Sequence, residues 1–157
     1  MKVTEQIYKD IQYMKVALLE GEKAFLQDEV PIGAVMVRDD VIISRAYNLR
    51  NTKKNPLRHA EIDIISESAE IVGDWRLEDC TLYVTVEPCP MCAGAIVQAR
   101  IPRIVYGTAS PKAGACGSIL NIVGEPKLNH RVEVLSGVLE EDCMALMQRF
   151  FVNCRKS

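Results

Sequence analysis

The sequence predicts an α/β domain with three layers, in which helices cover both faces of a mixed central sheet of about five strands. Short β-branched runs alternate with segments whose apolar residues recur at helical spacing. The 157 residues suffice for one core, so we expect a single domain spanning residues 1–157. The expected elements are helix 4–27, strands 32–37 and 41–47, a helix from after residue 56 to residue 73, strand 81–86, helix 93–99, strand 103–106, a short helix 118–123, strand 132–135 and a last helix from about residue 139.

The first helix is followed by a β-hairpin. Thr4 can cap the helix, and Pro31 ends the helical pattern. Four apolar residues at helical spacing form the face that we expect to pack inward: Ile7, Ile11, Met14 and Leu18. The pair Asp39–Asp40 predicts a tight turn between two adjacent strands, so the sheet must contain an antiparallel pair.

The second helix follows a polar loop, residues 48–56. Because Pro56 disfavours helical backbone in the residue before it, the helix should start after Pro56 and end at Gly73. We expect its inward residues to be Ile62, Ile65 and Ala69.

The remaining elements lead into and away from a cysteine motif. Strand 81–86 delivers the chain to this motif, and ligand sites in such sheets lie at the carboxyl ends of parallel strands. Residues 107–117 are rich in Gly, Ala and Ser and predict a loop. The last helix should pack through residues at helical spacing, namely Leu139, Cys143, Leu146 and Phe150.

Two short motifs carry the chemistry. Cys89 and Cys92 are three residues apart, so both can reach one metal ion from the first turn of a helix. His59 and Glu61 can serve the same site if they lie at a helix start. Three protein ligands leave one position open to water, as in a catalytic zinc site, and Glu61 can then carry a proton. The amino termini of both helices would favour thiolates there.

The order H-x-E followed by P-C-x-x-C matches an established signature of zinc-dependent nucleobase deaminases. Other interpretations remain open from these residues alone. The cysteine pair opening a helix after a strand also fits a thiol oxidoreductase, although His59 and Glu61 would then have no role. A non-catalytic zinc-binding RNA module is a further alternative.

Composition and charge narrow the classes of protein. No apolar run approaches the roughly 18 residues that span a membrane, and residues 1–5 form no apolar signal core, so we expect a cytoplasmic protein without membrane contact. The four cysteines outside the motif show no pairing pattern and suit core positions or exposed thiols: Cys80, Cys116, Cys143 and Cys154.

Basic residues gather near the motifs, although the net charge is −2. Residues 41–60 contain five basic and no acidic residues, and residues 88–124 contain three basic and no acidic residues. This distribution favours a phosphate-bearing substrate, although lysines that merely solvate a loop would give the same pattern.

The chain resembles the bacterial tRNA-specific adenosine deaminases over essentially its whole length. The matching stretches are residues 30–34, 48, 59–61, 75–77, 81–85, 87–89, 91–95, 100–103, 117–118, 129–132 and 150–151. The resemblance implies a cytidine-deaminase-like fold, one zinc ion per subunit with no organic cofactor, and a homodimer. It also implies hydrolytic conversion of the wobble adenosine of a tRNA anticodon stem-loop to inosine.

The resemblance also implies roles for individual residues. It assigns the zinc ion to His59, Cys89 and Cys92, and the proton shuttle to Glu61. Asn48 resembles the side chain that contacts the flipped purine. The expected substrate-binding residues are Asn48, Ala60, Lys112 and Phe151; of the Phe pair, Phe150 fits the core stripe, whereas Phe151 is free to stack on a splayed RNA base.

Two residues depart from the family pattern. Arg58 precedes the zinc histidine where the family usually has a small residue, and Ser110 stands where the family often has an acid. Both changes concern substrate contacts and leave the zinc chemistry intact. A deaminase of a free base or nucleoside, such as guanine, cytosine or adenosine, is therefore the alternative function.

Overall fold

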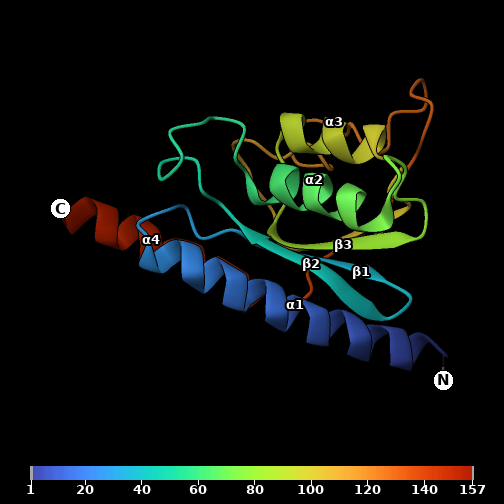
Figure 1. Cartoon of the computed structure of the whole chain (residues 1–157). Coiled ribbons are helices and arrows are strands. Elements are labelled where there is room, and N and C mark those ends of the chain that lie inside the picture. Colours follow the sequence, from blue (N-terminus) through green and yellow to red (C-terminus); the bar gives the residue numbers. More distant parts are fainter. Residues whose placement is uncertain (1, 157) are drawn as a thin grey trace.

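The computed structural model describes residues 2–156 and contains nine helices and strands in that range (Figure 1). In chain order these are α1 (Lys2–Leu26), β1 (Gly33–Arg38), β2 (Val41–Tyr47), α2 (Ala60–Val72), β3 (Cys80–Val86), α3 (Pro90–Gln98), β4 (Arg103–Thr108), β5 (Glu133–Ser136) and α4 (Glu140–Lys156). Within these residues, no helix combines the length and apolar character needed to cross a membrane.

The five strands form one mixed sheet in the order β2-β1-β3-β4-β5. β1 is antiparallel to both of its neighbours, whereas β3, β4 and β5 are parallel to one another. Helices α2 and α3 cover one face of the sheet, and α1 and α4 cover the other (Figure 1). The predicted three-layer architecture, with a mixed sheet of five strands, is confirmed.

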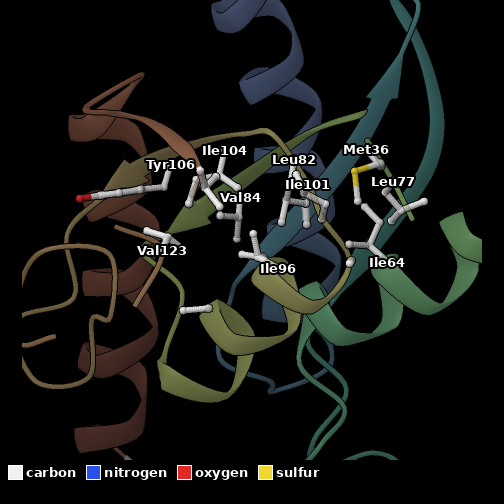
Figure 2. Close-up of a cluster of buried hydrophobic side chains, with 14 of the residues drawn as sticks. Met36, Ile64, Leu77, Leu82, Val84, Ile96, Ile101, Ile104, Tyr106 and Val123 are labelled. Atoms are coloured by element: carbon white, nitrogen blue, oxygen red, sulfur yellow. The ribbon is translucent and has the colours of Figure 1, made fainter. Parts of the chain in front are cut away.

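The central strands are buried on both faces because helices cover both. Leu82 and Val84 of β3 belong to the core beneath α2 and α3, whereas Tyr83 between them belongs to the core beneath α1 and α4. Figure 2 shows Ile64 of α2 and Ile96 of α3 facing side chains of the sheet in the first of these cores. A strand between two apolar layers must be apolar on both sides, which explains the β-branched run that predicted β3.

Helix α1 crosses very close to the start of β1. A Cβ atom added to Gly33 would lie 2.1 Å from the carbonyl oxygen of Ala17 and 2.3 Å from the amide nitrogen of Gly21. Only glycine permits this approach, so any side chain at position 33 would push α1 away from the sheet.

Two predicted helix faces are rotated relative to the observed ones. In α1, Met14 is buried as predicted, but Ile7 is exposed and the buried side contains small and charged residues: Asp10, Ala17, Glu20, Gly21 and Ala24. In α2, Ile64 and Ser68 are fully buried, whereas Ile65 only packs at the edge of the core. In α1, the buried residues Ala17, Gly21 and Ala24 are small and let the helix approach the sheet closely.

The predicted helix at residues 118–123 is wrong, and β4 extends two residues further than expected, through Thr108. Residues 116–121 form turns with an isolated bridge between Cys116 and Asn121, and Gly117 has φ of +137°. The amide of Ser118 donates to the buried carboxylate of Glu87, and the amides of Ile119 and Leu120 both donate to the carbonyl of Gly114. Turn and long-range hydrogen bonds therefore hold this segment in place of a helical hydrogen-bond pattern.

Candidate metal and substrate site

One edge of the sheet gathers the predicted site. β2, β3 and β4 end there, and β1 begins there because it is antiparallel to β2 and β3. Val30 therefore approaches this edge from before β1, Asn48 follows β2, and Cys89 follows β3. The structure thus places the site at the carboxyl ends of the parallel strands, as predicted.

The candidate metal ligands stand at the amino termini of two helices. His59 is the N-cap residue of α2, and Cys89 is the N-cap residue of α3. Both have extended backbone, and neither side chain caps its own helix. Cys92 lies in the first turn of α3, so its sulfur can reach the same point as that of Cys89. The unpaired amides of both helix starts supply partial positive charge that favours thiolates.

The three ligand atoms are spaced for a shared ion. Nδ1 of His59 lies 3.7 Å from Sγ of Cys89 and 3.5 Å from Sγ of Cys92, and all three atoms lie within 4.8 Å of one another. Tetrahedral bonds of about 2.1 Å to nitrogen and about 2.3 Å to sulfur would separate nitrogen and sulfur by about 3.6 Å. These three residues could therefore hold a metal ion, and their spacing and donor atoms fit zinc.

The pKa values of the two thiols favour binding of a cation. A hydrogen bond from Cys92 lowers the pKa of Cys89 to about 4, against the effect of burial. The same hydrogen bond, together with burial, raises the pKa of Cys92. One thiolate is therefore present at neutral pH, and a cation would favour ionisation of the second.

Glu61 lies beside the ligands in the first turn of α2, and its side chain is buried. Burial raises the pKa of this carboxyl to about 7, opposed by hydrogen bonds from its own backbone amide and from Cys92. A carboxyl group with such a pKa can both accept and release a proton near neutral pH. Glu61 follows His59 by two residues at the start of α2, and both side chains line the same cavity.

That cavity has a volume of about 120 Å³ and is lined by Val30, Ile32, Asn48, Arg50, His59, Ala60 and Glu61. Two of the predicted substrate residues, Asn48 and Ala60, thus meet the proposed proton carrier. Asn48 is fixed by its hydrogen bonds: Nδ2 donates to the carbonyl of Val30, and Oδ1 accepts from the amide of Arg50. Pockets for whole drug-sized ligands are typically about 300–1,000 Å³, so this cavity suits one base with its sugar and phosphates outside.

The other two predicted substrate residues meet in a separate groove between β4 and α4. The groove has a volume of about 600 Å³, and its lining includes Lys112, Met144, Met147, Phe151 and Arg155. Phe151 is 48% exposed, whereas Phe150 is half-buried, as the helical stripe predicted. Val86 also lines the groove and precedes Cys89 by three residues, at most about 10 Å along the chain.

The two departures from the family pattern occupy different surroundings. The guanidinium Nε of Arg58 donates to Asp63 of α2 at 2.6 Å, and Arg58 lines a surface hollow beside β2 and α2, outside the small cavity. Ser110 lines the groove with Lys112, and its amide donates to Glu87. Of the two, only Ser110 therefore lies among the predicted substrate residues.

Sequence reasoning missed several residues of the site. Val30, Ile32 and Arg50 line the cavity, and Val30 and Ile32 flank a proline directly before a strand, which was the available signal. Glu29 is buried and accepts hydrogen bonds from the amides of two residues in the 48–56 loop, Asn51 and Thr52. No sequence pattern predicts such a buried carboxylate, because its partners are backbone amides, which every residue except proline carries.

The remaining cysteines match their expected surroundings. Cys80, Cys116 and Cys143 are buried, and Cys154 is exposed. Among the described residues, His59, Cys89 and Cys92 form the one group of three or more potential ligands close enough to share an ion. The ring of His130 contacts the carbonyl oxygen of Ile101 at 2.7 Å.

Comparison with known proteins assigns the chain to a family. A family model described as MafB19-like deaminase matches residues 8–155. The tRNA-specific adenosine deaminase of Bacillus subtilis is 49% identical over 94% of this chain and 92% of its own length. The tRNA-specific adenosine deaminase of Haemophilus influenzae is 43% identical over 94% of this chain and 86% of its own length.

Two solved structures of deaminases have a similar fold. A structure from a study of A-to-I editing by tRNA:A34 deaminases is 41% identical and has a TM-score of 0.83, covering 86% of this chain and 98% of that one. The guanine deaminase from Nitrosomonas europaea has a TM-score of 0.79 over 90% of this chain and 84% of that one, but only 20% identity, so it supports the fold alone. The chain therefore belongs to the MafB19-like deaminase family and, among its members, to the tRNA-specific adenosine deaminases.

Proposed function

We propose that this protein hydrolyses the exocyclic amine of the wobble adenosine in a tRNA anticodon stem-loop, giving inosine and ammonia. The observation that carries the proposal is the convergence of His59, Cys89 and Cys92 within 4.8 Å beside the buried carboxyl of Glu61. The tRNA-specific relatives at 43–49% identity support the substrate class. Residues 1–157 would act as one catalytic domain.

We assign one zinc ion per subunit to His59, Cys89 and Cys92. When bound, zinc would supply Lewis acidity and lower the pKa of a coordinated water to about 7. The three side chains fit this ion in donor type and spacing, and the helix starts that carry them already favour thiolates.

Glu61 moves the protons of the reaction. Its carboxylate accepts a proton from the attacking water and delivers it to the ring nitrogen next to the reacting carbon, which makes that carbon more electrophilic. The second proton then passes through the same carboxyl to the departing amine, so that ammonia leaves. Burial of Glu61 and its raised pKa suit this double duty, because the group must lose and regain a proton in each cycle.

The cavity positions the base during these steps. Asn48 is held by two backbone groups and keeps hydrogen-bonding capacity for a purine edge. Val30 and Ile32 provide apolar walls that exclude bulk water. A base inside a duplex cannot enter so small a space, whereas an unstacked base of an anticodon loop can enter at low cost.

The groove between β4 and α4 would bind nucleotides that flank the target. Phe151 offers an exposed ring for stacking, Met144 and Met147 an apolar floor, and Lys112 and Arg155 charges for phosphates. A deaminase of a free base would need no such surface, so the groove favours RNA over the alternative substrate. We also expect a homodimer that acts in the cytoplasm.

A product assay tests the proposal. The purified protein is incubated with an anticodon stem-loop carrying adenosine at the wobble position, and nucleosides are analysed for inosine. A stem-loop with adenosine elsewhere in the loop, and free adenosine, guanine and cytosine, serve as comparison substrates. We expect inosine only from the wobble adenosine, whereas turnover of a free base without turnover of the RNA would contradict the substrate assignment.

A further inference from the structure

We propose that Glu87 is a positioning residue that locks the segment 109–118 onto the cysteine turn and so preforms the wall of the substrate groove. Its side chain is 3% exposed and stands directly between the end of β3 and the turn that contains Cys89. Its predicted effect on RNA turnover depends on the proposed function, whereas its effect on the segment itself does not.

The carboxylate gathers four hydrogen bonds from one segment. Oε1 accepts from the amide of Ser110 at 3.0 Å and also from the hydroxyl of Ser118. Oε2 accepts from the amides of Cys116 at 3.0 Å and Ser118 at 3.1 Å. Both ends of the segment, near residues 110 and 118, are therefore tied to a single buried side chain.

The chemistry of the partners requires a carboxylate. Backbone amides only donate, so three of the four partners need an acceptor, and an ionised carboxylate offers acceptors on both oxygens. Hydrogen bonds to a charged acceptor are stronger than neutral ones. An amide side chain of the same shape would present a donor on one side and could not satisfy this set.

The segment is also packed tightly around this group. A Cβ atom added to Gly114 would lie 2.4 Å from Oε1 and 2.5 Å from Oε2 of Glu87, so no side chain fits there. The next residue, Ala115, donates its amide to the carbonyl of Pro88 at 2.9 Å. The segment thus closes over Glu87 and contacts the cysteine turn directly.

The cysteine turn has support of its own, so the segment is what depends on Glu87. The amide of Glu87 donates to Thr108 across the sheet at 2.9 Å, and the carbonyl of Cys89 accepts the first hydrogen bond of α3 at 2.8 Å. Residues 109–112, by contrast, form part of the groove wall, and the Ser110 amide is their contact with Glu87. Releasing that amide should move Lys112 without releasing the metal ligands.

The variant Glu87→Gln tests this inference. If the amide oxygen of glutamine takes the Oε2 position, it still accepts from Cys116 and Ser118, and its NH₂ group can donate to the Ser118 hydroxyl. That NH₂ group then faces the Ser110 amide, which has lost its acceptor. We expect KM for the stem-loop to rise about tenfold or more, since hydrogen bonds to charged groups are worth that factor. We expect kcat to change less than about twofold and the zinc content to stay near one per chain.

Asp10→Asn is the matched control, because Asp10 is an equally buried carboxylate that contacts Arg103 at the start of β4 and does not line the groove. Hydrogen–deuterium exchange should show faster exchange of residues 109–118 in Glu87→Gln but not in the control. Ser118→Ala, which keeps all three amide partners, should raise KM only about two- to threefold and remains informative if Glu87→Gln does not fold.

Three results would overturn the inference: unchanged exchange of residues 109–118, loss of zinc with unchanged KM for the loaded enzyme, or equal KM changes in Glu87→Gln and the control. If the wild type does not deaminate the stem-loop, the proposed function fails, while exchange of residues 109–118 still decides the role of Glu87.

Discussion

Two buried carboxyl groups, Glu61 and Asp10, lie toward opposite edges of the same sheet and have opposite pKa shifts. Burial raises the pKa of Glu61 to about 7, because its neighbours stabilise the charge too little to offset the loss of water. Burial also raises the pKa of Asp10, but hydrogen bonds from Arg103, Tyr83 and Gln6 outweigh it and lower the pKa below its ordinary value.

The partners therefore decide what a buried acid can do. Arg103 contacts both oxygens of Asp10, at 2.9 and 2.8 Å, and the hydroxyl of Tyr83 donates at 2.6 Å. These bonds join α1 to β3 and β4. They also keep the carboxyl group of Asp10 ionised near neutral pH. Glu61 lacks a cationic side chain of this kind and can change its protonation state, which is what proton transfer requires.

The largest expected effect comes from removing the proposed proton carrier. In Glu61→Gln we expect kcat for inosine formation to fall by about 10²- to 10⁴-fold, the usual contribution of general acid–base catalysis. Stability and zinc content should not fall, because a neutral amide costs less to bury than a carboxylate. Activity, Tm and metal analysis of the same preparation provide the measurement, and full activity in this variant would remove Glu61 from the mechanism.

Asp10→Asn should have the converse effect: stability should fall, whereas kcat should not. Breaking a buried ion pair destabilises the fold, and we expect a loss of about 3 kcal/mol, or roughly 6–12 °C in Tm. The loss stays at the low end because Arg103 also contacts Glu133 at 3.3 Å. Assayed well below Tm, kcat should match the wild type. A fall in kcat without a fall in Tm would mean that the two carboxyl groups are not separate in role.

The same pair shows how far sequence reasoning reaches. The closeness of Glu61 to His59 was predictable, because the two residues are two positions apart at a helix start. Cys89 and Cys92 follow the same logic. Asp10 was not predictable, because its partner Arg103 is 93 residues away and only the tertiary fold brings them together. Its helix appeared amphipathic through Ile7, which is in fact 52% exposed.

The fold divides in a similar way. Strands and most helices were predictable from periodicity. An element buried on one face has apolar residues at regular spacing, and a strand buried on both faces has a continuous apolar run. The region after β4 was not, because backbone amides of residues 110–118 bind the side chain of Glu87 and a sequence does not display backbone donors. Asn48 was predicted from resemblance and Lys112 from the basic stretch 88–124, and only the structure assigns them to separate hollows.

If chemistry is confined to the small cavity, changes in the groove should alter binding alone. In Phe151→Ala we expect KM for the stem-loop to rise about 5- to 150-fold with little change in kcat, since stacking of one base contributes roughly 1–3 kcal/mol. Val152→Ala is the matched control, because Val152 is also exposed on α4 but lines a different hollow. Equal effects of the two substitutions would argue against a stacking role for Phe151.

The smallest expected effect is a difference in acid stability between the wild type and Asp10→Asn. Since the pKa of Asp10 is lower in the folded protein than its ordinary value of 3.8, its ionised form stabilises the fold above that pH. This contribution is lost as the pH falls through the lower pKa of the folded state. We therefore expect the Tm difference between the two proteins to be constant near neutral pH and to shrink below about pH 4. Both proteins share the proposed zinc site, so acid release of the ion would affect both alike. A difference that stays constant to low pH would show that Asp10 is not held ionised.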